Sequence, residues 1–125
     1  MKNTTVFTES APAAIGPYSQ AIISNNVVYA SGQIPIIPAT GKVIEGDITV
    51  QAEQVMQNIK NILQAAGTDF SNVVKTTCFL YDINDFDAFN KVYAKFFTSK
   101  PARSCVAVKE LPKNVLVEVE VIATL

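Results

Sequence analysis

The chain has 125 residues, of which 49% are hydrophobic and 17% are charged, and its formal net charge is −1. A near-neutral chain without a basic run offers no electrostatic footprint for nucleic acid or an anionic membrane, and we expect neither partner. The sequence contains no histidine, which excludes Ser-His-Asp and Cys-His catalysis, and its two cysteines lack the ligand spacing of a zinc site.

The N-terminal residues contain no long apolar stretch, and no run approaches the ~20 apolar residues of a membrane span. We therefore expect a cytoplasmic protein that folds as one domain over residues 1–125. Cys78 and Cys105 are far apart in strand-like surroundings, which favours reduced thiols over a disulfide.

The first part of the chain predicts short strands and an ordered loop. Residues 5–7 are β-compatible, whereas residues 11–20 contain two prolines and a glycine in a mostly apolar stretch. Such a loop is expected to lie over a pocket or against another subunit, or else to be a packed surface turn. Residues 22–24 and 27–30 predict a hairpin, because the two asparagines between them tolerate a left-handed turn.

Gly32 follows this hairpin and indicates a bulge or a close approach of backbone, and Pro35 ends the strand. Residues 38–47 are expected to be a loop. Apolar residues at helical spacing then predict a helix over residues 48–66, with Gly67 as its C-terminal cap.

The second half of the chain predicts a central strand over residues 73–81 and a helix that begins near Asp85, with Asn84 placed to cap it. Two further strands are expected over residues 102–108 and 115–124. The fold class is therefore α+β, with two helices packed on one face of a sheet. The other face stays bare, which predicts an oligomer.

Arg103 is the only arginine in a chain with nine lysines, and it begins a strand after a proline. Its planar guanidinium grips a carboxylate through two bonds, so it is the first candidate for a carboxylate contact. The alternative is an ordinary exposed arginine at a strand end.

Pairing the last two strands as a hairpin, valine against valine, sets Cys105 opposite Glu118 and Arg103 opposite Glu120. That register gathers a guanidinium, a thiol and two carboxylates on one sheet face. One interpretation is a carboxylate-binding arginine beside a water-activating base, and the other is a cross-strand salt bridge between Arg103 and Glu120. The pKa of Glu118 would be raised by burial and lowered by Arg103, and the sequence leaves the balance open.

An ordered set of motifs spans nearly the whole chain and resembles the RidA (YjgF) family, the reactive intermediate deaminases. The matching segments are residues 11–20 (APAAIGPYSQ), 31–35 (SGQIP), 65–67 (AAG), 74–77 (VKTT), 85–86 (DF) with Asn90, 101–106 (PARSCV), 111–114 (LPKN) and 118–123 (EVEVIA).

The resemblance implies a homotrimer of chorismate-mutase-like subunits, with a central β-barrel, helices outside and a cleft at each subunit interface. It implies hydrolysis of 2-imino acids and their enamine tautomers, such as 2-iminobutanoate and 2-iminopropanoate, to 2-oxo acids and ammonia, without a cofactor. By position, Arg103 binds the substrate carboxylate, Glu118 orients or activates water, and Cys105 lines the site. The resemblance also places in the pocket Tyr18, Ser31, Asn90 and, through its backbone, Gly32.

The chain departs from the family pattern at two positions. Lys100 stands where many members carry an aromatic residue before the proline, and Ala107 stands where relatives often have glutamate. Two other functions stay open at this point. One is a non-catalytic ligand-sensing or regulatory protein that uses the same cleft, and the other is an RNA-cleaving or translation-inhibiting protein, which the charge balance and the absence of histidine disfavour.

Overall fold

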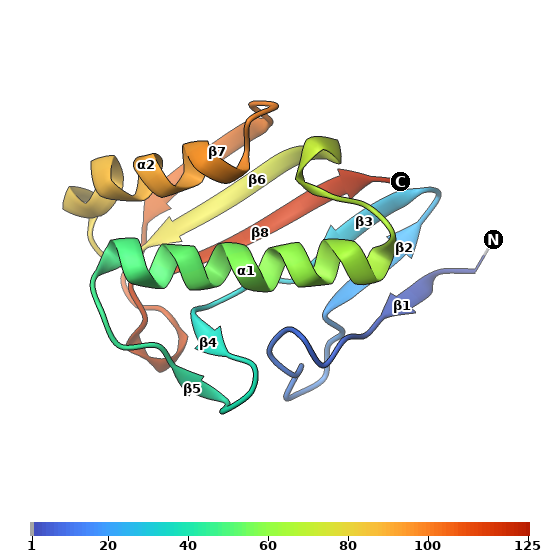
Figure 1. Ribbon diagram of the computed structural model, residues 1–125, viewed down its shortest axis with the longest axis horizontal. Helices are drawn as coiled ribbons and strands as arrows, with labels where there is room; N and C mark the ends of the chain where they lie inside the picture. Colours follow the sequence, from blue (N-terminus) through green and yellow to red (C-terminus); the bar gives the residue numbers. More distant parts are fainter. Residues whose placement is uncertain (1) are drawn as a thin grey trace.

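The structure is a computed structural model that describes residues 2–125, so Met1, the first residue of the expected 1–125 domain, lies outside the described residues. Within that range the chain forms one mixed sheet of six strands, a small two-stranded ribbon and two α-helices (Figure 1). In spatial order the sheet consists of β1 (Thr4–Val6), β2 (Ala21–Ser24), β3 (Val27–Ala30), β8 (Val117–Thr124), β6 (Val73–Leu80) and β7 (Ala102–Ala107). The helices are α1 (Ile48–Ala66) and α2 (Phe86–Phe96), and three 3-10 turns are η1 (Phe70–Asn72), η2 (Ile83–Asp85) and η3 (Pro112–Asn114).

Both helices lie in front of the sheet in Figure 1, with α1 along its middle and α2 beside the β7 edge. The buried side chains of α1 pack on the sheet and include Val55, Met56, Ile59, Ile62 and Leu63. This arrangement confirms the predicted α+β fold with two helices on one face.

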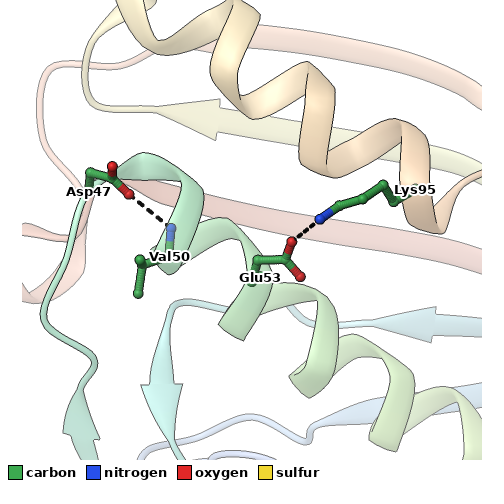
Figure 2. Close-up of polar contacts among 4 residues, drawn as sticks. All are labelled: Asp47, Val50, Glu53 and Lys95. Carbon is green, nitrogen blue, oxygen red and sulfur yellow. Dashed lines mark hydrogen bonds and ion pairs between the residues drawn. The ribbon is translucent and has the colours of Figure 1, made fainter.

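The predicted helix over residues 48–66 is confirmed, and its two ends have clear local causes. Asp47 Oδ1 accepts a hydrogen bond from the Val50 amide at 3.1 Å, which satisfies one of the free amides of the first turn (Figure 2). Gly67 adopts the left-handed conformation with φ 91°, and its N–H donates to the Gln64 carbonyl. The asparagine hairpin is also confirmed, since Asn25 and Asn26 have φ values of 51° and 63°.

Two local predictions are wrong. Asn84 does not cap the second helix: it lies inside η2, where its backbone N–H donates to Asp82 Oδ1 at 2.9 Å, and α2 begins only at Phe86. Residues 38–47 are not only loop, because β5 (Lys42–Val43) pairs with β4 (Ile36–Ile37) in an antiparallel ribbon.

The predicted hairpin between the last two strands is also wrong, because β6 lies between them. β7 pairs with β6 in parallel, and β8 pairs with the other edge of β6 in antiparallel. The chain crosses the end of β6 instead of turning back on itself: the Val108 amide donates to the Leu80 carbonyl at 2.9 Å, and the Tyr81 amide donates to the Leu116 carbonyl at 3.0 Å. A central β6 has its backbone groups paired on both edges.

The observed register separates Arg103 from Glu118. Arg103 lies beside Thr76, which lies beside the buried Val121, so these three side chains share the face that the helices cover. Glu118 lies beside Phe79, one position out of phase, and points to the opposite face. The predicted convergence of Arg103, Glu118 and Glu120 on one face of a single chain is therefore wrong, whereas Arg103 and Cys105 do share a face.

The face away from the helices carries large apolar side chains in contact with solvent. Tyr29 is 49% exposed and Val106 is 46% exposed, and both belong to the Glu118 side of the sheet by register. The prediction of one bare sheet face is confirmed. In residues 2–125 neither helix is long and apolar enough to cross a membrane.

Candidate active site

Arg103 is held by the helix that covers its strand. Its Nη1 donates to Asn90 Oδ1 at 2.7 Å, and its Cζ lies 4.6 Å from the centroid of the Tyr93 ring and 5.5 Å from that of Phe86. Phe86, Asn90 and Tyr93 are spaced four and three positions apart on α2, which puts them on one face of the helix. The guanidinium is therefore both hydrogen-bonded and stacked on aromatic faces, which fixes its plane.

Tyr93 connects this platform to the sheet. Its hydroxyl shares a hydrogen bond of 2.8 Å with Thr76 Oγ1, on the strand next to Arg103. Burial raises the pKa of the Tyr93 phenol, so the ring stays neutral beneath the cation. Tyr93 and Thr76 were not predicted as site residues, although the helical spacing of Tyr93 from Asn90 was a usable signal.

The guanidinium opens into a cleft of about 510 Å³, which we call the Arg103 cleft. Its lining residues are Asn90, Tyr93, Ala94, Phe97, Thr98, Lys100, Pro101 and Arg103. Asn90 takes one of the five N–H donors of a guanidinium, so the fork that binds a carboxylate is not consumed by this bond. Lys100, at which the chain departs from the family pattern, lies in the wall of this cleft.

Cys105 follows Arg103 on the same face and lies beside Cys78 of β6. Burial raises the pKa of the Cys105 thiol, although the charge of Arg103 lowers it in part. Burial also raises the pKa of Cys78 to about 12. Both thiols are therefore protonated near neutral pH, and Cys105 presents a neutral surface instead of a thiolate nucleophile.

Glu118 lies on the opposite face, against the backbone of Gly32. A Cβ atom placed on Gly32 would lie 2.2 Å from Glu118 Oε2, so only glycine leaves room for the carboxylate as it is placed. The next residue pair fixes this contact, because the Gln33 backbone N–H donates to the Val119 carbonyl at 2.8 Å and the Gln33 carbonyl accepts from the Val119 N–H at 3.1 Å. The expected close approach of backbone at Gly32 is confirmed.

The pKa of Glu118 is raised, mainly by burial and further by the neighbouring charge of Glu120. Arg103 is not among the causes, since it points to the other face. The balance that the sequence left open is therefore decided by burial. A raised pKa makes the ionised carboxylate a stronger base than an ordinary glutamate.

Tyr18 and Ser31 lie near Gly32 on the loop of residues 11–20 and at the end of β3. Tyr18 is 54% exposed, and the Ser31 hydroxyl donates to the Ser19 carbonyl at 2.6 Å, so this hydroxyl anchors the loop. The loop covers a second hollow of about 310 Å³, which we call the Tyr18 cavity, so the expectation that this apolar loop lies over a pocket is confirmed. Its lining residues are Pro12, Ala13, Ile15, Tyr18, Gln20, Gly32, Gln33, Ile34, Ile36, Pro112 and Lys113.

The seven expected site residues thus form two groups in one chain. The first group lies between β7 and α2 and consists of Asn90, Arg103 and Cys105. The second lies where the loop meets β8 and consists of Tyr18, Ser31, Gly32 and Glu118. In residues 2–125 no group of three or more His, Cys, Asp or Glu side chains is placed to hold a metal ion.

Comparison with known proteins places this fold and these motifs in one family. The family model described as Endoribonuclease L-PSP matches residues 8–125. The chain is 50% identical over 123 residues to the 2-iminobutanoate/2-iminopropanoate deaminase of Salmonella typhimurium, with 95% of each chain covered.

Two solved structures have the same fold over nearly their whole length. YyfA from Yersinia pestis, a member of the conserved Rid protein family, superposes with a TM-score of 0.97 at 50% identity, covering 99% of this chain and all of the other. TdcF from E. coli, solved with bound serine, gives a TM-score of 0.92 at 42% identity, with 98% of each chain covered. The chain therefore belongs to the RidA (YjgF) family of Rid proteins, which the Endoribonuclease L-PSP model describes.

Proposed function

We propose that this protein is a hydrolytic deaminase that converts reactive 2-imino acids and their enamine tautomers, such as 2-iminobutanoate and 2-iminopropanoate, to 2-oxo acids and ammonia. The observation that carries the proposal is the placement of Arg103, whose guanidinium is fixed by Asn90 and Tyr93 at an open cleft. Such a group binds a small carboxylate with defined orientation. The deaminase name of the Salmonella relative and the serine bound to TdcF, itself an amino acid with a carboxylate, support the same chemistry.

The proposed site is shared between two chains of a homotrimer with a central β-barrel. Arg103 and Glu118 lie on opposite faces of one sheet, so a small substrate bound to Arg103 reaches a Glu118 only from another copy. The bare face with Tyr29 and Val106 is the apolar surface that such an assembly would cover. In this arrangement Glu118, Gly32, Ser31 and Tyr18 of one chain complete the Arg103 cleft of its neighbour.

The proposed chemistry needs little more than orientation and a base. Arg103 holds the substrate carboxylate, and the carbon of the C=N bond faces a water molecule bound to Glu118. Glu118 takes a proton from the water as its oxygen adds to that carbon, which gives a carbinolamine. When the substrate imine is protonated on nitrogen, this carbinolamine carries a neutral amino group, to which Glu118 passes the proton. As the C–N bond breaks, the hydroxyl oxygen forms the carbonyl and gives its proton back to Glu118, and ammonia and the 2-oxo acid leave. No cofactor takes part, and Cys105 lines the site as a neutral thiol.

The direct test is an assay in which a threonine dehydratase generates 2-iminobutanoate and the release of ammonia is followed with and without this protein. The wild-type protein is expected to accelerate the release, and Arg103→Ala is expected to abolish the acceleration. Arg103→Lys keeps the charge but loses the planar fork, so we expect most of the activity to be lost there as well. A wild-type rate equal to that in buffer would reject the deaminase and favour the ligand-sensing alternative.

A further inference from the structure

The short turn that joins α2 to β7 brings a second cation to the Arg103 cleft (Figure 1). Lys100 lies at the end of this turn, two residues before β7 begins, and lines the cleft together with Arg103. The Lys100 backbone N–H donates to the Phe97 carbonyl at 3.2 Å, which closes the turn. The chemistry proposed above gives Lys100 no role, although it lies in the wall of the same cleft.

The backbone conformation of Lys100 explains how both cations come to line one cleft. Residues 100 and 103 are an odd number of positions apart, so in a continuous strand their side chains would point to opposite faces. Lys100 instead has the left-handed conformation, with φ 56°, which breaks the alternation just before β7. A lysine is less stable in this conformation than a glycine or an asparagine, so the local backbone does not account for a lysine at this position.

The wall of the Arg103 cleft contains two cations and no carboxylate. In residues 2–125 the one ion pair joins Lys95 to Glu53, so neither Lys100 nor Arg103 is neutralised within the chain. The other lining residues are all uncharged and are Asn90, Tyr93, Ala94, Phe97, Thr98 and Pro101. Two unneutralised cations in one cleft attract a ligand that carries two negative groups more strongly than a ligand that carries one.

The cleft is also larger than the smallest imino acids require. Its volume of about 510 Å³ lies in the range of pockets that hold drug-sized ligands, whereas 2-iminobutanoate has only four carbon atoms. A substrate with a longer side chain therefore has room while its carboxylate is bound to Arg103. The ammonium of Lys100 is carried on a flexible stem of four carbons, which lets it meet a second carboxylate at the end of that side chain.

We infer that Lys100 determines specificity in the Arg103 cleft, and that the preferred substrates are 2-imino acids whose side chain ends in a carboxylate, such as the imine of glutamate. Arg103 binds the carboxylate next to the C=N bond, and the Lys100 ammonium binds the side-chain carboxylate. This inference rests on the proposed deaminase function and names the substrate class of that site.

The test compares two imines of equal chain length, 2-iminopentanedioate and 2-iminopentanoate. Amino-acid oxidases generate them in the assay from glutamate and norvaline, with catalase present, and the release of ammonia above the rate in buffer gives kcat/KM. The wild type is expected to prefer the dicarboxylate, chiefly through a lower KM, because the Lys100 contact is remote from the reacting carbon. Added salt should weaken the preference, since it screens the attraction between the two charges.

Substitutions of Lys100 examine its charge. Lys100→Met keeps the length of the side chain and is expected to lower the ratio of kcat/KM for the two imines about fivefold, the upper end for an ion pair in contact with solvent. Lys100→Arg keeps the charge and should retain the preference. Lys91→Met is the matched control and should leave the ratio unchanged, because Lys91 is exposed on α2 and does not line the cleft.

The outcomes separate this inference from the deaminase proposal. A wild-type preference for 2-iminopentanoate, or a ratio that Lys100→Met leaves unchanged, would reject the inference and leave the deaminase intact. An equal loss for both imines in Lys100→Met would also reject it, because Lys100 would then act on a group that both substrates share. No turnover of these imines or of 2-iminobutanoate by the wild type would reject the deaminase itself, and the substrate class with it.

Discussion

Glycine at position 32 is required by a side chain 86 positions further along the chain. The missing Cβ leaves the space that Glu118 Oε2 occupies, and the nearest Glu118 atoms would lie 2.2 Å and 2.9 Å from an added Cβ. Because those atoms belong to the end of a flexible side chain, the carboxylate moves aside more readily than the backbone.

Gly32→Ala is therefore expected to fold with little loss of stability and to lose most of its deaminase activity, because the proposed base is displaced. Steady-state rates with 2-iminobutanoate and thermal unfolding of the same preparation check this. Gly41→Ala is the control for a glycine-to-alanine change without a steric clash, because no atom lies within 4 Å of a Cβ at Gly41. Its φ of 73° means that this control is itself expected to lose some stability. Wild-type turnover in Gly32→Ala would contradict the placement of the base.

Glu118 also makes stability depend on pH. Its pKa is raised in the folded state by burial and by Glu120, so the folded protein holds this proton more tightly than the unfolded chain does. Stability is therefore lost as pH rises from the ordinary pKa of glutamate through the raised value, and it is retained below that window.

Glu118→Gln removes this ionisation. We expect the variant to unfold at a higher temperature than the wild type at pH 8, with a difference that shrinks toward pH 4, and to lose turnover at both values. Thermal unfolding at a fixed protein concentration measures the effect. A difference that grows toward acid pH would mean that the folded protein prefers the ionised carboxylate.

At the scale of elements, α1 is held at its start by a cap and to α2 by an exposed ion pair. Asp47 accepts from the Val50 amide, and Lys95 of α2 pairs with Glu53 of α1 (Figure 2). The two side chains of the ion pair are 60% and 36% exposed, so solvent screens their attraction.

Asp47→Ala is expected to lower the free energy of unfolding by about 1 kcal/mol, as is typical for the loss of a side-chain cap. Lys95→Met is expected to change it by less than about 0.5 kcal/mol, and that small effect should vanish at high salt. Urea unfolding of both variants gives the comparison. A larger loss in Lys95→Met than in Asp47→Ala would reverse this ranking.

At the scale of the whole molecule, the position of β6 between β7 and β8 decides how the site is assembled. It turns Arg103 toward the helices and Glu118 toward the bare face, so in the proposed deaminase each chain would supply two half-sites. A mixed oligomer of one variant that lacks Arg103 and another that lacks the Glu118 carboxylate should then regain part of the deaminase activity.

Arg103→Ala and Glu118→Gln chains are each expected to be inactive. When they are unfolded together and refolded as a 1:1 mixture, about a quarter of the sites in a cyclic oligomer with random assembly should combine an intact Arg103 with an intact Glu118. Ammonia release from the mixture, compared with each variant alone, tests this. Light scattering should show the same oligomeric species for each variant and for the refolded mixture. If the mixture forms that oligomer and is inactive, both residues would act within one chain.

The sequence by itself determined the elements whose causes are local. The 3.6-residue period of residues 48–66, Gly67 at their end and the Asn25–Asn26 turn each act within a few positions, so α1 and the first hairpin were predicted correctly. The motifs that resemble the RidA family also predicted Arg103, Asn90 and Gly32 as site residues.

Only the tertiary structure decided which strands are neighbours. The alternating valines of β8 are compatible with pairing to β7 or to β6, because a buried sheet face requires only that every second side chain be apolar. Because β8 pairs with β6, Arg103 does not face the carboxylates of β8 as predicted. Its partners are instead the Asn90 amide and the Tyr93 ring of α2. Gln33 Oε1 is buried without a donor, which no local pattern reveals, because it depends on what the folded chain brings near that atom.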